Sequence, residues 1–182
     1  TGTANGLPYF IMPYVEGESL AMHLTKGQMP VRETVAILKD VAPALAFAHE
    51  RGVVHRDIKP GNILLAGGSA MVTDFGVAKA LSSARRTNPD AVNHGLTTDG
   101  ASIGTLMYMA PEQAAADPDI DGRADIYSLG ATAYEMLTGA PPFAGLPDRA
   151  MLAARMSKLP PALSTVRDDV PADLDALILH CL

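Results

Sequence analysis

Four polar residues between positions 57 and 74 have the side-chain types and the spacing that proton transfer and metal binding need. Asp57 and Lys59 place a carboxylate and an ammonium group two residues apart, and Asn62 and Asp74 flank two short apolar runs. A positioned carboxylate can accept a proton from a reacting group. Asn and Asp side chains offer the hard oxygen ligands that Mg²⁺ prefers. A hairpin between Asn62 and Asp74 would bring both to one metal ion.

Each of these residues also has an ordinary structural explanation. An Asp near a Lys commonly forms a solvated ion pair, and an Asn before an apolar run is commonly a turn residue. The sequence Asp-Phe-Gly at 74–76 suits a hairpin turn. Taken singly, these features favour the structural explanation, so the case for chemistry depends on their combination.

Three motifs occur in order along the chain: HRDIKPGN at 55–62, DFG at 74–76 and APE at 110–112. Together they resemble the signature motifs of protein kinases. The lysine two residues after Asp57, and Gly104-Thr105 ahead of the third motif, are similar to serine/threonine kinases rather than tyrosine kinases. The first and third motifs are most similar to bacterial, eukaryotic-like members. The resemblance covers nearly the whole chain.

The resemblance implies a protein kinase-like fold that is α+β as a whole. Residues 1–15 are expected to form the last strand of the small lobe and the hinge. Residues 16–182 are expected to form the mainly α-helical large lobe (C-lobe) with a short β-hairpin, truncated at its C-terminus. The glycine-rich loop, strand lysine and helix glutamate that such kinases also use are not in these 182 residues. We therefore expect most of the small lobe to precede this chain.

The resemblance gives Asp57, Lys59 and Asn62 catalytic roles in phosphoryl transfer from ATP. Asp57 is expected to accept or orient the proton of a substrate hydroxyl group. Lys59 is expected to point toward the γ-phosphate and to screen its charge. Asn62 and Asp74 are expected to bind Mg²⁺, which in turn bridges the phosphates.

The adenine site is expected at the start of the chain. Met12, Pro13 and Val15 resemble the gatekeeper and hinge, where the Pro13 carbonyl would accept from the adenine amino group and the Val15 amide would donate to the ring. Leu64 is expected to form the floor under the adenine. Ordinary core packing of Leu64 is the alternative, and both fit the sequence equally well.

Four further residues are implied to have structural roles: His55, Phe75, Glu112 and Asp125. His55 is expected to pack against Phe75 in a hydrophobic spine. Glu112 is expected to pair with an arginine that would follow Leu182. Asp125 is expected to hold the backbone of the catalytic loop, with a helix N-cap as the alternative role.

Regulation is expected in the long polar segment between the second and third motifs. Arg56 marks kinases whose activation loop is ordered by phosphorylation, and Lys79 is its expected partner in binding a phosphate. Thr97 and Thr98 are the first candidates for that phosphate, and Thr105 belongs to the same regulatory segment. The alternative is that these hydroxyl groups only keep the loop soluble.

Hydrophobic periodicity and the positions of Gly and Pro predict the regular elements. The longest early helix contains Pro43, where a kink is expected. The pair Gly67-Gly68 is expected to turn a hairpin. The predicted elements are a strand over 8–12, hairpin strands over 63–65 and 70–72, and helices over 34–49, 125–137, 150–158 and 172–182.

Composition restricts the class of protein. A hydrophobic content of 48% supports a folded core, and a net charge of −6 argues against nucleic acid as a partner. No apolar run is long enough to span a membrane, so no membrane contact is expected within this segment. Cys181 is the single cysteine and cannot form an internal disulfide, which favours a reducing compartment.

These observations together predict an ATP- and Mg²⁺-dependent serine/threonine protein kinase. Its expected partners are proteins with Ser or Thr acceptors and, for autophosphorylation, a second copy in a homodimer. The expected location is cytoplasmic, either free or as the cytoplasmic domain of a membrane-anchored kinase. The alternative is a non-catalytic, kinase-like module that serves as a scaffold or docking domain.

Overall fold

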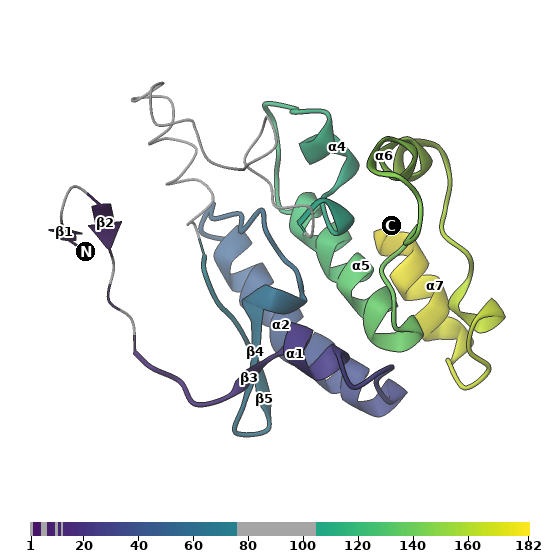
Figure 1. Ribbon diagram of the computed structural model, residues 1–182, viewed down its shortest axis with the longest axis horizontal. Helices are drawn as coiled ribbons and strands as arrows, with labels where there is room; N and C mark the ends of the chain where they lie inside the picture. The colour runs from purple at the N-terminus through teal and green to yellow at the C-terminus, as the bar shows by residue number, and fades with distance from the viewer. Residues whose placement is uncertain (1, 5–6, 10, 12, 76–104) are drawn as a thin grey trace.

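The computed structural model describes residues 2–4, 7–9, 11, 13–75 and 105–182. At the N-terminus, β1 (Gly2–Ala4) and β2 (Leu7–Tyr9) pair as antiparallel strands that lie away from the helical body (Figure 1). The strand predicted over 8–12 overlaps β2, whereas its partner β1 was not predicted. Phe10 and Met12 lie outside the described residues.

A second sheet of three antiparallel strands lies against the helical body. Its order is β3 (Glu18–Ser19), β4 (Ile63–Ala66) and β5 (Ser69–Val72). Gly67 and Gly68 join β4 to β5 with φ angles of 58° and 81°. Two successive left-handed residues form the turn that matches the twist of paired strands, and glycine adopts this conformation at little cost. The hairpin prediction is confirmed, and the two-residue strand β3 is an addition to it.

The described residues include six α-helices. They are α1 (Leu20–Leu24), α2 (Val31–His49), α4 (Pro111–Ala114), α5 (Arg123–Thr138), α6 (Asp148–Ser157) and α7 (Ala172–Cys181). The four long helices that the periodicity predicts are confirmed, with ends that differ by up to three residues. Helix α2 continues through Pro43, and the kink expected there stays a prediction. Three short 3₁₀ turns are also described: η1 (Pro60–Asn62), η3 (Thr105–Met107) and η4 (Leu163–Thr165).

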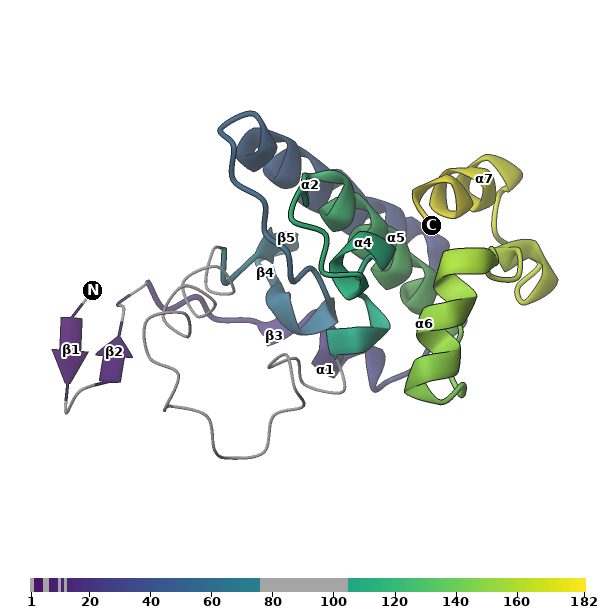
Figure 2. The ribbon, with the colours of Figure 1, turned by 90° about the horizontal axis from the view of Figure 1, so that it is seen from above.

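Helix α5 is the centre of the hydrophobic core. Most of its residues are buried, and α2 and α7 pack against it (Figure 2). Met136 and Leu137 of α5, Val41 of α2 and Ile63 of β4 are fully buried in one cluster. The loop between α2 and β4 therefore joins two elements that both contribute to the buried core. Among the described residues, no helix is long and apolar enough to cross a membrane.

Candidate active site

The buried carboxylate of Asp125 anchors the loop that carries the HRDIKPGN motif. Asp125 is 0% exposed, and its Oδ2 accepts from the backbone N–H of His55 at 2.8 Å. Its Oδ1 accepts from the backbone N–H of Arg56 at 2.7 Å, and the ring Nε2 of His49 lies 2.7 Å from Oδ2. The N-cap alternative is wrong, because Gly122 is the N-cap of α5 and Asp125 bonds the loop. Helix α5 thus fixes the loop backbone through one side chain.

His55 links the loop to the strand that precedes the DFG motif. Its Nδ1 accepts from the backbone N–H of Asp57 at 3.2 Å, so Nε2 carries the proton and donates to the Thr73 carbonyl at 2.8 Å. The His55 ring also meets the Phe75 ring edge-on, with centroids 4.7 Å apart. His55 is only 1% exposed. Its ring therefore packs between the loop that carries the HRDIKPGN motif and the DFG segment.

Asp57, Lys59 and Asn62 meet at one carboxylate oxygen. Lys59 Nζ lies 2.9 Å from Asp57 Oδ2, and Asn62 Nδ2 donates to the same oxygen at 2.9 Å. Asn62 Nδ2 also donates to the Asp57 backbone carbonyl at 2.7 Å. These bonds use the amide nitrogen of Asn62 and leave its Oδ1 as the acceptor of that side chain. The 3₁₀ turn η1, which ends at Asn62, produces this close return of the chain.

The β4–β5 hairpin brings Asn62 and Asp74 to the same end of the sheet. The backbone N–H of Thr73 donates to the Asn62 carbonyl at 2.9 Å, which extends the strand pairing by one step. Asp74 follows directly with a φ of 63° and an exposed side chain. Positive φ is costly for a residue other than glycine, and residues in this conformation tend to cluster at functional sites, although Ala116 and Phe143 also adopt it. Arg56 has the same feature, with a φ of 68°.

The donor set at this end of the hairpin fits a magnesium ion that is shared with phosphates. Asp74 contributes a carboxylate, and Asn62 contributes an amide oxygen whose nitrogen partner is already fixed by Asp57. Mg²⁺ commonly takes only one or two protein ligands and completes its shell with water and substrate phosphates. In the described part of the chain no cluster of three or more His, Cys, Asp or Glu side chains could hold a metal alone.

Leu64 lies on the side of β4 that faces away from the core. Its neighbours Ile63 and Leu65 belong to the core or pack against it, while Leu64 is half-buried and does not. The strand alternation explains this difference, because successive side chains point to opposite faces. The arrangement argues against core packing as the role of Leu64. Ser19 pairs with Leu64 in the register of β3 and β4.

The expected hinge residues lie in the extended segment that leads into β3. Pro13 and Val15 are exposed, and Met12 lies outside the described residues. Ser19, at the end of this segment, accepts the backbone N–H of Met22 at 3.2 Å and so caps α1.

The segment before the APE motif is clamped by a buried arginine of α6. The Arg155 guanidinium donates to the backbone carbonyls of Leu106, Met107 and Met109, and its distance to the last is 3.0 Å. Arg155 is 6% exposed, and burial lowers its pKa. An arginine suits this place because its planar fork of donors can serve several carbonyls at once.

Helix α5 holds the same segment from the other side. Ser128 Oγ donates to the Tyr108 carbonyl at 2.8 Å, and the Tyr108 hydroxyl donates to Glu135 Oε2 at 2.6 Å. Burial, together with the neighbouring Glu135, raises the pKa of Tyr108 far above its usual value. Burial also raises the pKa of Glu135, although the hydrogen bond from Tyr108 partly opposes this.

Gln113 connects this segment to the loop of the first motif. Its Nε2 donates to the Arg56 carbonyl at 2.9 Å, and its Oε1 accepts from the Ala110 backbone N–H at 3.1 Å. Sequence reasoning missed Gln113, Arg155 and the Tyr108–Glu135 pair. The position of Gln113 directly after the APE motif was the one available signal, because a polar side chain there can reach back to cap the short helix α4.

The remaining predicted residues are only partly placed. Lys79, Thr97 and Thr98 lie outside the described residues, and Thr105 begins the 3₁₀ turn η3. Glu112 is half-buried and, within the described part of the chain, forms no ion pair.

Comparison with known proteins agrees with this geometry. The protein kinase domain model matches residues 4–182. The chain belongs to the protein kinase family. It is 39% identical over 183 residues to serine/threonine-protein kinase PknB of Mycobacterium leprae. This match covers 99% of this chain and 28% of that protein. It is 37% identical over 173 residues to serine/threonine-protein kinase PknL of Mycobacterium tuberculosis, and this match covers 94% of this chain and 41% of that protein.

A solved structure gives the same result for the fold. The crystal structure of a mutant PknI kinase domain from Mycobacterium tuberculosis matches with a TM-score of 0.64 and 34% sequence identity, over 93% of this chain and 54% of that one. The predicted kinase fold and the resemblance to bacterial serine/threonine kinases are confirmed. The chain thus spans a little over a quarter of the length of PknB and about half of the PknI kinase domain.

Proposed function

We propose that this chain is the hinge and large lobe of a serine/threonine protein kinase, with residues 1–15 as the last small-lobe strand and hinge. The observation that carries the proposal is the arrangement of Asp57, Lys59 and Asn62 around one carboxylate oxygen. A solvated surface ion pair has no need of a buried anchor, whereas the loop that carries this group is anchored by Asp125, which accepts from the backbone N–H groups of His55 and Arg56. The anchored loop backbone thus fixes the direction in which the Asp57 side chain points.

Asp57 acts on the acceptor hydroxyl group of a Ser or Thr side chain. Both bonds from Lys59 and Asn62 end on Oδ2, so Oδ1 is the oxygen that accepts the hydroxyl proton. Phosphoryl transfer depends mainly on positioning and on charge stabilisation. Lys59 therefore has two tasks, since its ammonium group orients Asp57 and lies where it can offset phosphate charge.

Asn62 and Asp74 are the proposed ligands of Mg²⁺, and Leu64, Met12, Pro13 and Val15 the proposed adenine contacts. Bound Mg²⁺ and ATP supply the transferable phosphoryl group and neutralise the charge that develops on it. Asn62 keeps its Oδ1 available because its nitrogen is engaged by Asp57.

Regulation and partners complete the proposal. A phosphate on Thr97 or Thr98 would be bound by Arg56 and Lys79, which would order the segment that contains Thr105. The partners are protein substrates and a second copy for autophosphorylation, and the location is cytoplasmic, free or beneath a membrane anchor.

Phosphate transfer by the full-length protein tests the proposal. With Mg²⁺ and γ-labelled ATP, it should phosphorylate a Ser- or Thr-containing protein, and chelation of Mg²⁺ should stop the reaction. Asp57→Asn should lower the rate by about 10²- to 10⁴-fold, whereas Asp168→Asn at an exposed position should not. A folded, ATP-binding protein without transfer activity would favour the scaffold alternative.

A further inference from the structure

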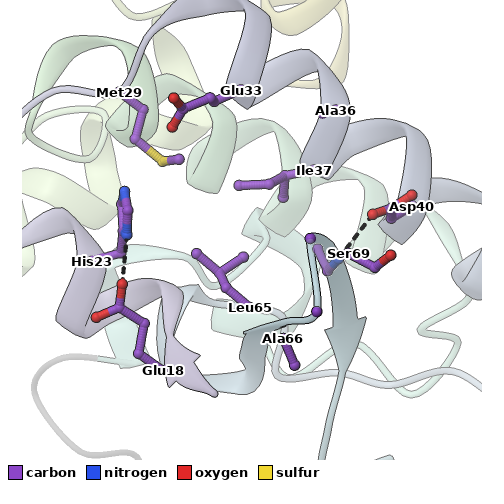
Figure 3. A pocket seen from close by; sticks show the side chains of 13 residues that line it. Glu18, His23, Met29, Glu33, Ala36, Ile37, Asp40, Leu65, Ala66 and Ser69 are labelled. Carbon is purple, nitrogen blue, oxygen red and sulfur yellow. Dashed lines mark hydrogen bonds and ion pairs between the residues drawn. The ribbon is translucent and has the colours of Figure 1, made fainter. Parts of the chain in front are cut away.

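A groove at the tip of the β4–β5 hairpin, called here the hairpin groove, lies outside the candidate active site. It has a volume of about 310 Å³ and is bounded by α1, the first half of α2 and the hairpin tip (Figure 3). Its main lining side chains are Met29, Ile37 and Leu65 in the floor and Glu18, Glu33 and Asp40 at the rim.

The floor of the hairpin groove is apolar. Met29 and Ile37 are 2% and 7% exposed, and both point toward the half-buried Leu65 across the space (Figure 3). Pockets that bind small molecules range from roughly 300 to 1,000 Å³. A volume at the lower end of this range accepts one or two apolar side chains better than a cofactor.

The rim of the hairpin groove is acidic. Glu33, Ala36 and Asp40 lie at i, i+3 and i+7 on α2 and form one exposed face of that helix. Asp40 Oδ2 accepts from the Ala70 backbone N–H at 2.8 Å, which fixes its carboxylate at the hairpin. Exposed Ala36 between the two acids leaves the entrance open.

Glu18 faces these acids from the other side of the hairpin groove. Lys26 Nζ lies 2.8 Å from Glu18 Oε1, and His23 Nδ1 lies at the same distance. These bonds hold the pKa of Glu18 below its usual value, so it remains ionised. Lys26 offsets one of the three negative charges, and the basic residues Arg32 and Lys39 of α2 do not line the groove.

We propose that the hairpin groove binds an extended basic protein segment, with one large apolar side chain in the floor and Lys or Arg side chains at the rim. Complementary charge favours such a partner, since an acidic peptide or a nucleic acid would meet like charge both at the rim and on a chain of net charge −6. The apolar floor supplies the affinity and the acidic rim selects the sign of the partner's charge.

The hairpin groove and the candidate active site lie at opposite ends of one hairpin. Asn62 and Asp74 flank its open end, whereas Gly67 and Gly68 form the tip beside the groove. Four residues of strand separate the two ends by about 13 Å. A segment bound in the groove therefore leaves Asp57 accessible. Binding there does not depend on the proposed kinase activity, so the two proposals can fail separately.

Direct peptide binding to the full-length protein tests the inference. The probe is a positional-scanning library of decapeptides, with affinity measured by fluorescence anisotropy. We expect selection of Arg or Lys at two or more positions and of one Leu, Ile, Met or Phe. Affinity should fall as salt is raised, because exposed charge pairs are screened. Selection of acidic peptides, or no selection at all, would overturn the proposal.

Two variants and a matched control locate the binding site. Glu33→Gln with Asp40→Asn removes two charges and keeps an acceptor for Ala70, and it should weaken the selected peptide about three- to thirtyfold. Ala36→Trp should block the groove and abolish binding.

The control Glu50→Gln with Asp168→Asn removes the same charge at exposed positions elsewhere. It should bind the peptide like the wild type. Thermal unfolding checks that each variant is folded. Equal peptide affinity in the wild type and both groove variants would show that the peptide binds at another surface.

Discussion

Asp57 and Asp74 are both carboxylates of the candidate active site, but their surroundings differ. Asp57 is tied to Lys59 and Asn62, and the backbone of its loop is held by Asp125. Asp74 is exposed and stands in a left-handed backbone conformation at the end of the hairpin. The first arrangement suits a residue that orients a substrate hydroxyl group. The second suits a carboxylate that binds a metal ion, because Mg²⁺ takes few protein ligands and completes its shell with water and phosphates.

This difference predicts distinct effects for two conservative substitutions in the full-length protein. Asp57→Asn should lower phosphate transfer by about 10²- to 10⁴-fold while leaving the affinity for Mg²⁺·ATP within about twofold of the wild type, because no metal ligand is lost. Asp74→Asn should abolish transfer and also weaken Mg²⁺·ATP binding by tenfold or more, since it removes a charged ligand. Isothermal titration calorimetry measures both affinities. Equal affinities in the wild type and Asp74→Asn would contradict the proposed role of Asp74.

At this scale the motifs identified Asp57, Asn62 and Asp74, and the family resemblance implied that Asp125 holds the loop. Neither could identify His49, which bonds Asp125 across 76 positions of sequence. Such a partner depends on how α2 packs against α5, and helical periodicity says only which face of each helix is buried.

At the scale of elements, the segment 105–113 is held by three separate parts of the molecule. Arg155 of α6 binds its carbonyls, α5 binds Tyr108 through Ser128 and Glu135, and Gln113 reaches the loop that carries Arg56. Under the proposed function this segment lies next to Asp57, which accepts the proton of the substrate hydroxyl group. Its position should therefore affect the peptide substrate more than ATP.

Arg155→Lys tests the clamp on this segment. A lysine ammonium group cannot serve three carbonyls in the planar geometry of a guanidinium group, so buried acceptors are left without partners. The variant should lose about 1–3 kcal/mol of unfolding free energy, and the KM for a peptide substrate should rise while the KM for ATP does not. Urea unfolding and steady-state kinetics measure the two effects. Arg123→Lys at an exposed position is the control, and parallel rises in both KM values would contradict the positioning role.

The Tyr108–Glu135 pair predicts a dependence of stability on pH. Because burial raises the pKa of Glu135 in the folded state, the folded protein holds this proton to higher pH than the unfolded chain does. The stability contributed by the protonated carboxyl group is present below pH 4.5, which is the ordinary pKa of a Glu side chain. It is lost as the pH rises through the higher pKa of the folded state. Glu135→Gln keeps an acceptor for Tyr108 and lacks this loss.

Relative to the wild type, Glu135→Gln should therefore gain unfolding free energy as the pH rises above 4.5, the ordinary pKa of Glu. Denaturant unfolding at several pH values measures the difference, and Glu16→Gln, at an exposed position, is the control. A difference that is constant with pH, or that changes in the opposite direction, would show that Glu135 is not destabilised by burial.

The elements that could be predicted from the sequence are those with a periodic or apolar pattern, or a turn sequence, of their own. Helices α2 and α5 show long periodic or apolar patterns, and Gly67-Gly68 specifies the hairpin turn. The two-residue strand β3 and the five-residue helix α1 carry no such pattern. They form because β4 offers an open edge and because Ser19 caps the helix that follows. Short elements of this kind depend on their neighbours and not on their own propensity.

At the scale of the whole molecule, one hairpin separates two surfaces of different chemistry. Its open end presents Asn62 and Asp74, and its tip borders the acidic hairpin groove. Strand β5 of this hairpin packs against α2, which itself packs against the central helix α5. Under the two proposals, a protein segment bound at the tip would leave the residues that carry out phosphate transfer accessible.

The last prediction concerns the 182-residue polypeptide tested by itself. Phosphoryl transfer needs contacts that cover the phosphates and a lysine on the α- and β-phosphates, and these 182 residues contain no G-x-G-x-x-G sequence. In the described part of the chain, Asp74 and Phe75 are also exposed. The purified polypeptide should therefore transfer phosphate at a rate indistinguishable from its own Asp57→Ala variant, although it is folded by circular dichroism. Clear transfer by the wild-type polypeptide that Asp57→Ala abolishes would show that the large lobe alone can position ATP, and that the missing contacts affect rate or regulation only.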